Sequence, residues 1–117
     1  MNSARNYHAG LLAEASVLRH FTQAGYSVLA RRFRGAHGEI DLIVSRDALI
    51  VFVEVKKSSS FEAALARMTP AQTRRIFQTA EEFLARQNLS TLSDTRFDIA
   101  LVNVTGQVEV MEGVFGP

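Results

Sequence analysis

Residues 48–56 constrain the fold more than any other segment of the chain. This run is rich in valine, isoleucine and phenylalanine, and apolar side chains occupy both sets of alternating positions. Because successive side chains of a strand point to opposite faces, such a run has two apolar faces and is typical of a buried, central strand. The run therefore predicts the middle of a sheet that is covered by other elements.

The segment before this strand has helical spacing. Leu11, Leu18 and Phe21 recur at intervals that place them on one stripe of a helix over residues 4–24, and Gly25 is expected to end that helix. Glu14 falls on the same stripe, and a carboxylate that faces a core is costly unless a partner compensates it. Strands are then expected over residues 26–32 and 39–44 and in the central run, with short turns at 34–38 and 46–47.

A second helix is signalled by its first residues. Thr69 is a typical N-cap, Pro70 suits the first helical position, and Gln72 completes a capping box. This helix is expected to reach about residue 87, and its expected buried face consists of Ile76, Phe77, Ala80, Phe83 and Leu84. A short helix over 61–67 should precede it. A polar connection at 88–95 and two strands at 97–104 and 107–111 should follow it. The order predicts an α/β fold with a central mixed sheet flanked by helices.

Composition excludes several classes of protein. With 117 residues, the chain is expected to form a single domain over residues 1–117, and its 47% hydrophobic and 21% charged residues are typical of globular proteins. The absence of cysteine excludes disulfides and thiolate metal sites. We see no secretory signal and no apolar run of about 20 residues that would cross a membrane, so we expect a cytoplasmic protein.

The pattern with chemical meaning spans two neighbouring strands. In the first, Ile40, Leu42 and Val44 are expected to point one way, and Glu39 and Asp41 the other way. In the second, Glu54 and Lys56 are two residues apart, so they share one face near the end of an otherwise apolar strand. If the two strands pair antiparallel, Asp41 lies beside Glu54.

Two adjacent carboxylates repel each other, and a divalent cation with oxygen ligands removes that repulsion. We therefore predict a Mg²⁺ (or Mn²⁺) site with Asp41 and Glu54 as ligands, the carbonyl of Val55 as a further candidate, and Glu14 as a direct or water-mediated ligand. Lys56 beside the ion would orient the attacking water and offset charge on a phosphate, so the predicted catalytic set is Asp41, Glu54, Lys56 and Glu14.

Basic residues surround this acidic centre, although the net charge is only +1. Clustered arginines and lysines suit contacts with the phosphates of nucleic acid, and solvated surface charge is the alternative interpretation. The predicted nucleic-acid contacts are Arg32, Arg34, Lys57, Arg74 and Arg75.

The chain resembles the YraN family of small bacterial proteins, in the PD-(D/E)xK nuclease-like group, and is similar to archaeal Holliday-junction resolvases. The resemblance rests on Glu14, residues 38–43, residues 51–56, Thr69-Pro70 with Arg74-Arg75, and residues 96–98, in family order over nearly the whole chain. It implies a restriction-endonuclease-like core, Mg²⁺ dependence and phosphodiester cleavage. The sequence departs from the family pattern at Lys57 and Ser58, at Gln72 and at Arg32, which leaves the substrate open.

Three functions follow as alternatives. The first is a metal-dependent endonuclease that acts on DNA, including branched or damaged DNA. The second is a nucleic-acid-binding module that keeps the fold without catalysis, and the third is a scaffold in which the charged residues only stabilise the hairpin. The expected partner is DNA, no membrane is expected, and both a monomer and a homodimer are compatible with the sequence.

Overall fold

The computed structural model describes residues 3–89 and 94–114, with side chains described from residue 10 onward. The helices and strands follow the predicted order, and most boundaries lie within two residues of the expected ones. The predicted connection at 88–95 lies partly outside the described residues. The elements are α1 (Ser3–Gln23), β1 (Ser27–Arg34), β2 (Glu39–Arg46), β3 (Leu49–Lys57), α2 (Phe61–Ala66), α3 (Pro70–Arg86), β4 (Thr95–Val102) and β5 (Val108–Met111).

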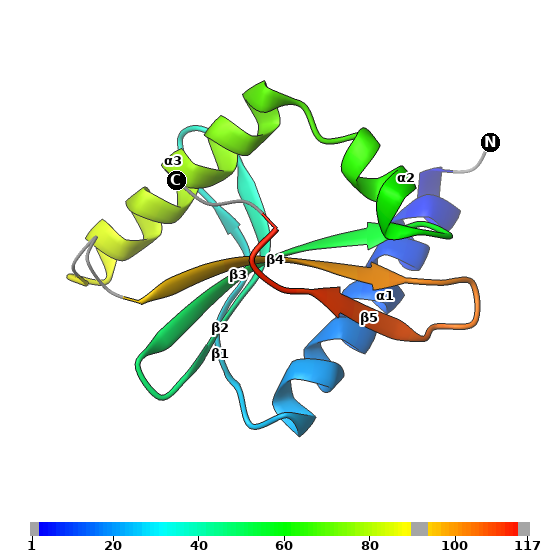
Figure 1. Cartoon of the computed structure of the whole chain (residues 1–117), viewed down its shortest axis with the longest axis horizontal. Coiled ribbons are helices and arrows are strands. Elements are labelled where there is room, and N and C mark those ends of the chain that lie inside the picture. Colours follow the sequence, from blue (N-terminus) through cyan, green and yellow to red (C-terminus); the bar gives the residue numbers. More distant parts are fainter. Residues whose placement is uncertain (1–2, 90–93, 115–117) are drawn as a thin grey trace.

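The strands form one five-stranded mixed sheet in the order β1-β2-β3-β4-β5 (Figure 1). The first three strands are antiparallel neighbours, β4 is parallel to β3, and β5 is antiparallel to β4. The parallel pairing of β3 with β4 requires a long crossover connection, which α2 and α3 provide. β3 is therefore the central strand, as its two apolar faces predicted.

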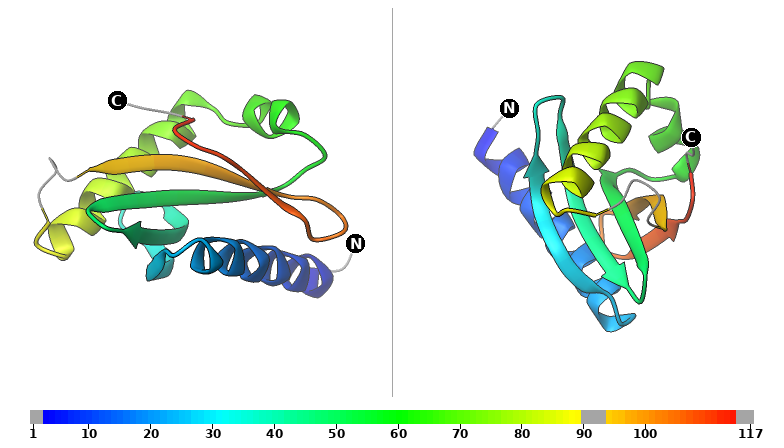
Figure 2. Two further views of the ribbon diagram at one scale, coloured as in Figure 1. Left: turned by 60° about the horizontal axis from the view of Figure 1, so that its bottom comes forward. Right: turned by 90° about the vertical axis from the view of Figure 1, so that its left-hand side faces the viewer.

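Helices cover both faces of the sheet: α1 lies on one face and α2 and α3 lie on the other (Figure 2). Apolar side chains of β3 alternate between the two resulting cores. Val51 and Val53 pack in the core under α1, while Ile50 and Phe52 pack in the core under α3. This arrangement confirms the predicted α/β fold and is consistent with a restriction-endonuclease-like core.

The start of α3 matches its prediction. The Thr69 side chain accepts a hydrogen bond from the Gln72 backbone, and the Gln72 side chain accepts one from the Thr69 backbone, so the capping box is complete. The buried face of α3 contains Thr79 in addition to the predicted residues, and Phe77 is only partly buried.

The buried stripe of α1 differs from the prediction. Ala13, Val17 and Phe21 are the buried residues, whereas Leu18 packs at the margin of the core and Leu11 is only partly buried. The true stripe is rotated by roughly a quarter turn from the predicted one, given about 100° per residue. Among the described residues, no helix combines the length and apolarity needed to cross a membrane.

Candidate metal and phosphate site

The candidate site lies where the β2–β3 ladder ends. The last paired residues of this ladder are Leu42 and Val53, and beyond them the two strands separate. The Asp41 carboxylate lies in the gap, where its Oδ2 accepts a hydrogen bond of 2.8 Å from the backbone N–H of Val55. A side chain thus takes a position that a backbone carbonyl would hold in a continued ladder.

The separation coincides with an irregularity in the pairing of β1 with β2. Arg32 has a φ of 50°, which is unusual for a residue with a side chain, and it lies between the pairs Arg31–Leu42 and Phe33–Ile40, opposite Asp41. The predicted alternation of β2 is wrong here. Ile40 packs in the core under α3, whereas Leu42 and Val44 pack in the core under α1. The kink at this position interrupts the regular alternation of β2 side chains between the two faces of the sheet.

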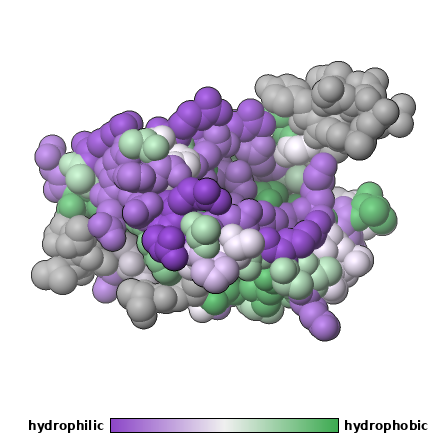
Figure 3. Space-filling view, turned by 90° about the horizontal axis from the view of Figure 1, so that it is seen from above, coloured by the Kyte–Doolittle hydropathy of each residue, from purple (hydrophilic) through white to green (hydrophobic). Residues whose placement is uncertain are grey.

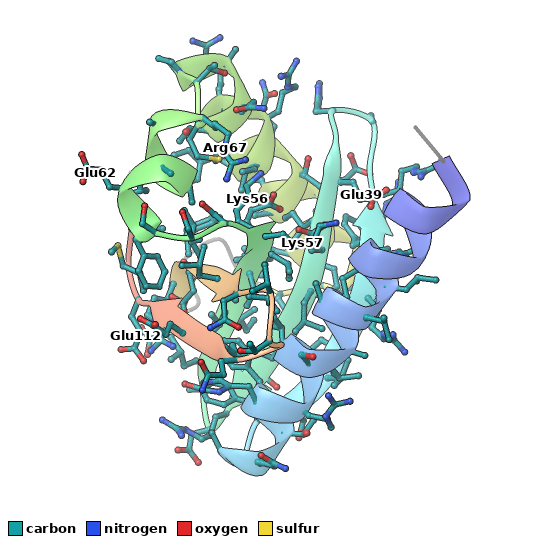
Figure 4. All side chains as sticks on the ribbon, turned by 90° about the vertical axis from the view of Figure 1, so that its right-hand side faces the viewer. Glu39, Lys56, Lys57, Glu62, Arg67 and Glu112 are labelled. Atoms are coloured by element: carbon teal, nitrogen blue, oxygen red, sulfur yellow. The ribbon has the colours of Figure 1, made fainter. Side chains whose placement is uncertain are left out.

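Glu54 and Lys56 share one face of β3, as predicted. Both line a cavity of about 170 Å³ between the sheet and the start of α3. Figure 4 shows Lys56 and Lys57 at the end of β3, with α1 on one side of them and α2 and α3 on the other. The remaining walls of the cavity are Gly38, Glu39, Met68, Gln72, Arg75 and Ile76.

A second cavity, of about 150 Å³, opens on the α1 side of the same strand end. Asp41 and Glu14 line this cavity together with Val55 and Lys57. The four predicted catalytic residues are therefore gathered at one end of β3, but they are divided between two cavities. Glu54 and Lys56 line one of them, and Asp41 and Glu14 line the other.

The electrostatics of this end are dominated by partly buried carboxyl groups whose ionisation is unfavourable. Burial, followed by the charge of Asp41, raises the pKa of Glu54 to about 8, and Lys56 only partly opposes this increase. Burial is also the largest cause of the raised pKa of Asp41, to which the charges of Glu14 and Glu39 add. A backbone hydrogen bond from Asp41 also lowers the pKa of Glu54, but Glu54 Oε1 is buried without a hydrogen-bond partner. This oxygen lacks the compensation that a buried polar atom normally finds.

Two of the predicted nucleic-acid contacts pair with acids in the structure. Arg32 binds Glu14 with its Nη2 2.7 Å from Oε2, and Arg34 binds Glu39 with its Nη2 3.0 Å from Oε2. The other predicted contacts are exposed: Arg74, Arg75 and Lys57. Of these, Arg75 lines the cavity beside Glu54.

The donor set suits a divalent cation in part. Asp41, Glu54 and the carbonyl of Val55 offer hard oxygen atoms, and Mg²⁺ commonly takes one or two carboxylates and completes its shell with water and phosphate. The unpartnered Glu54 Oε1 is an oxygen of this kind. Within residues 3–89 and 94–114, however, there is no group of three or more His, Asp or Glu side chains placed to hold a metal by themselves.

One positioning residue, Glu82 of α3, was not predicted. Its Oε1 accepts a 2.9 Å hydrogen bond from the backbone N–H of Ala36, which fixes the β1–β2 turn to the helix. A Cβ at Gly35 would lie 2.7 Å from the same oxygen, so a larger residue there would require the end of the Glu82 side chain to move. This contact joins residues 46 positions apart, and no local pattern in the sequence signals it.

Comparison with known proteins identifies the family. The model of the uncharacterised protein family UPF0102 matches residues 13–102, which include all of β1, β2, β3 and β4 and the whole candidate site. The chain belongs to UPF0102. This membership confirms the resemblance to the YraN family that the motifs indicated, and it carries no named activity.

Several bacterial members of UPF0102 match nearly the full chain. A UPF0102 protein of Roseobacter denitrificans is 55% identical over 106 residues, covering 91% of this chain and 82% of the relative. One of Cereibacter sphaeroides is 47% identical over 115 residues and 98% of both chains. Another, of Ruegeria pomeroyi, is 46% identical over 112 residues, or 96% of this chain and 91% of its own.

Proposed function

We propose that this UPF0102 protein is a metal-dependent endonuclease that hydrolyses phosphodiester bonds in DNA, including branched or damaged DNA. The observation that carries the proposal is Glu54. Its buried Oε1 has no hydrogen-bond partner, and Asp41 raises its pKa further. Asp41 on β2 and Glu54 on β3 line separate cavities, but their charges interact across the separated strand ends. A cation bound by both carboxylates would relieve this repulsion.

Asp41, Glu54 and the carbonyl of Val55 are the residues that would hold Mg²⁺ or Mn²⁺. When bound, such an ion supplies Lewis acidity for a phosphoryl oxygen and lowers the pKa of bound water. Lys56 lies on the same face of β3 as Glu54 and lines the same cavity. In this proposal its ammonium would orient the attacking water and offset charge on the phosphate.

Exposed arginines at the start of α3 favour the binding of DNA on this side of the sheet. Arg75 borders the cavity that contains Glu54 and Lys56, and Arg74 lies next to it on the exposed start of α3. The outer surface over α2 and α3 is mostly hydrophilic (Figure 3). These arginines and Lys57 would contact phosphates, so binding should weaken as salt increases.

Cleavage of labelled linear, nicked, flapped and four-way DNA with Mg²⁺ or Mn²⁺ tests the proposal. Lys56→Ala should lower the rate by about 100- to 1,000-fold, as loss of one charge-stabilising group does in other enzymes, with DNA binding largely retained. The matched control is Arg19→Met, which removes one exposed positive charge from the side of α1. If Lys56→Ala and Arg19→Met cleave equally fast, Lys56 has no catalytic role.

A nucleic-acid-binding module without catalysis is the second candidate. It is favoured by the lack, among the described residues, of a third acidic or histidine ligand beside Asp41 and Glu54. This candidate predicts that the wild type binds the same DNA substrates and cleaves none of them with either metal.

A further inference from the structure

The contact between Arg32 and Glu14 is the best-defined ion pair near the candidate site. Arg32 Nε donates to both carboxylate oxygens, at 2.9 Å and 3.2 Å, and Nη2 donates to Oε2 at 2.7 Å. The Glu14 side chain is only 17% exposed, and the Arg32 side chain is 37% exposed. A guanidinium that engages both oxygens of a sheltered carboxylate forms a strong and directional pair.

The backbone of β1 is adapted to this pair. Arg32 adopts a φ of 50°, a conformation that costs an ordinary residue about 1 kcal/mol or more. Such strain persists only where the surrounding structure determines it. Here it accompanies the kink opposite Asp41 and places the guanidinium on the α1 side of the sheet, against Glu14.

The pair lies at the edge of the proposed metal site. Glu14 and Asp41 line the same cavity of about 150 Å³, together with Val55. The charges of Glu14 and Asp41 also interact. Without Arg32, these two carboxylates would attract a second divalent cation beside the ion held by Asp41 and Glu54. With Arg32 present, a fixed positive charge already neutralises Glu14, and it repels any cation that approaches this carboxylate.

We propose that Arg32 takes the place of a second divalent cation, so that the protein binds a single metal ion, at Asp41 and Glu54, and Glu14 is not a ligand. The inference rests on the proposed function. Arg32 is then a positioning residue: it keeps Glu14 away from the bound ion and leaves Lys56 as the cationic group beside it. Hydrolysis by this protein would therefore depend on one ion rather than on two.

Counting bound Mn²⁺ by electron paramagnetic resonance tests this inference without reference to activity. The full chain is titrated with Mn²⁺ alone, as wild type and as Arg32→Gln, Glu14→Gln and the double variant. We expect one ion for the wild type and for Glu14→Gln. Arg32→Gln should gain a second ion or bind the first about tenfold more tightly, a change that the double variant should reverse. Arg32→Lys keeps the positive charge but lacks the paired Nε and Nη2 donors, and its Mn²⁺ binding should stay near that of the wild type.

Four results would overturn the inference, and they separate it from the proposed function. Identical binding by wild type and Arg32→Gln, two ions in the wild type, or loss of the ion in Glu14→Gln each contradict the role of Arg32 while the metal site stands. No bound Mn²⁺ in any of the proteins overturns the proposed metal site and the inference with it. If circular dichroism shows that Arg32→Gln does not fold, wild type and Glu14→Gln still test whether one ion binds and whether Glu14 is a ligand, and two ions in the wild type or loss of the ion in Glu14→Gln overturn the inference.

Discussion

The two ends of the β2–β3 hairpin differ in what their residues contribute. At the turn end, residues 42–46 and 49–53 pair without interruption, and most of their side chains are buried and apolar. At the other end the ladder stops, and Asp41, Glu54 and Lys56 occupy the gap. One strand, β3, therefore stabilises the fold through its first half and carries the polar chemistry in its second half.

This difference has an energetic meaning. Buried apolar pairs at the turn end add stability, whereas a buried carboxylate with an unpartnered oxygen reduces it. The comparison predicts that substitutions at the two ends will have opposite effects on stability.

The largest effect is expected at the turn end. Phe52 is 2% exposed, stacks on Phe97 with ring centroids 5.1 Å apart, and contacts the edge of Phe83 at 6.1 Å. Phe52→Ala should lower the free energy of unfolding by about 3–5 kcal/mol, measured by urea denaturation. Leu12→Ala is the control, because Leu12 is 70% exposed, and it should change stability by less than about 0.5 kcal/mol. Equal stabilities for the two variants would contradict the assignment of the core.

At the separated end we expect a substitution to increase stability. The pKa of Glu54 rises from 4.5 to about 8 on folding. The contribution of Glu54 to the stability of the folded state is therefore most favourable below pH 4.5 and declines as the pH rises toward 8. Glu54→Gln removes this decline. Without metal, the variant should be more stable than the wild type by a few kcal/mol, on the order of 3, at pH 9, and should match it near pH 4.5.

Thermal melts of both proteins across this pH range, in buffer with a chelator, measure the effect. Glu109→Gln provides a matched control, because Glu109 is an exposed carboxylate on β5 and its replacement should change stability by less than about 0.5 kcal/mol. A Glu54→Gln variant that is less stable than the wild type at every pH would show that Glu54 is a stabilising residue, against the comparison.

A smaller effect is expected at the start of α3, which forms a wall of the cavity at the separated end. Thr69→Ala removes the side-chain acceptor of the 3.1 Å hydrogen bond from the Gln72 backbone. Stability should fall by about 1 kcal/mol, and Thr69→Ser, which keeps the acceptor, should restore it. If the alanine and serine variants melt at the same temperature, the capping box contributes nothing measurable here.

The sequence predicted those features that are encoded locally. The capping box of Thr69 and Gln72 requires only residues three positions apart, and the two apolar faces of β3 are visible in one continuous run. The shared face of Glu54 and Lys56 follows from the period of a strand. These signals were sufficient for the order of the elements and for the centre of the candidate site.

The features that the sequence did not predict depend on distant contacts. Ile40 changes faces because the strands kink at Arg32 and Asp41, and a regular alternation cannot anticipate such a kink. Arg32 was expected to contact nucleic acid and Glu14 to support a metal, yet the two side chains, 18 positions apart, bind each other. On α1, the apolar residues fitted two neighbouring stripes, and packing against the sheet selected the one with Ala13 and Val17.

The central claim, that the separated end of the hairpin binds a divalent cation, is tested most directly by Mn²⁺ titration calorimetry. Wild type, Asp41→Ala and the carboxylate control Glu109→Ala are titrated under the same conditions, first alone and then with a DNA duplex present. We expect wild type and Glu109→Ala to bind Mn²⁺ alike and Asp41→Ala not to bind it. If Asp41→Ala and wild type behave identically with DNA present, the separated end is not a metal site.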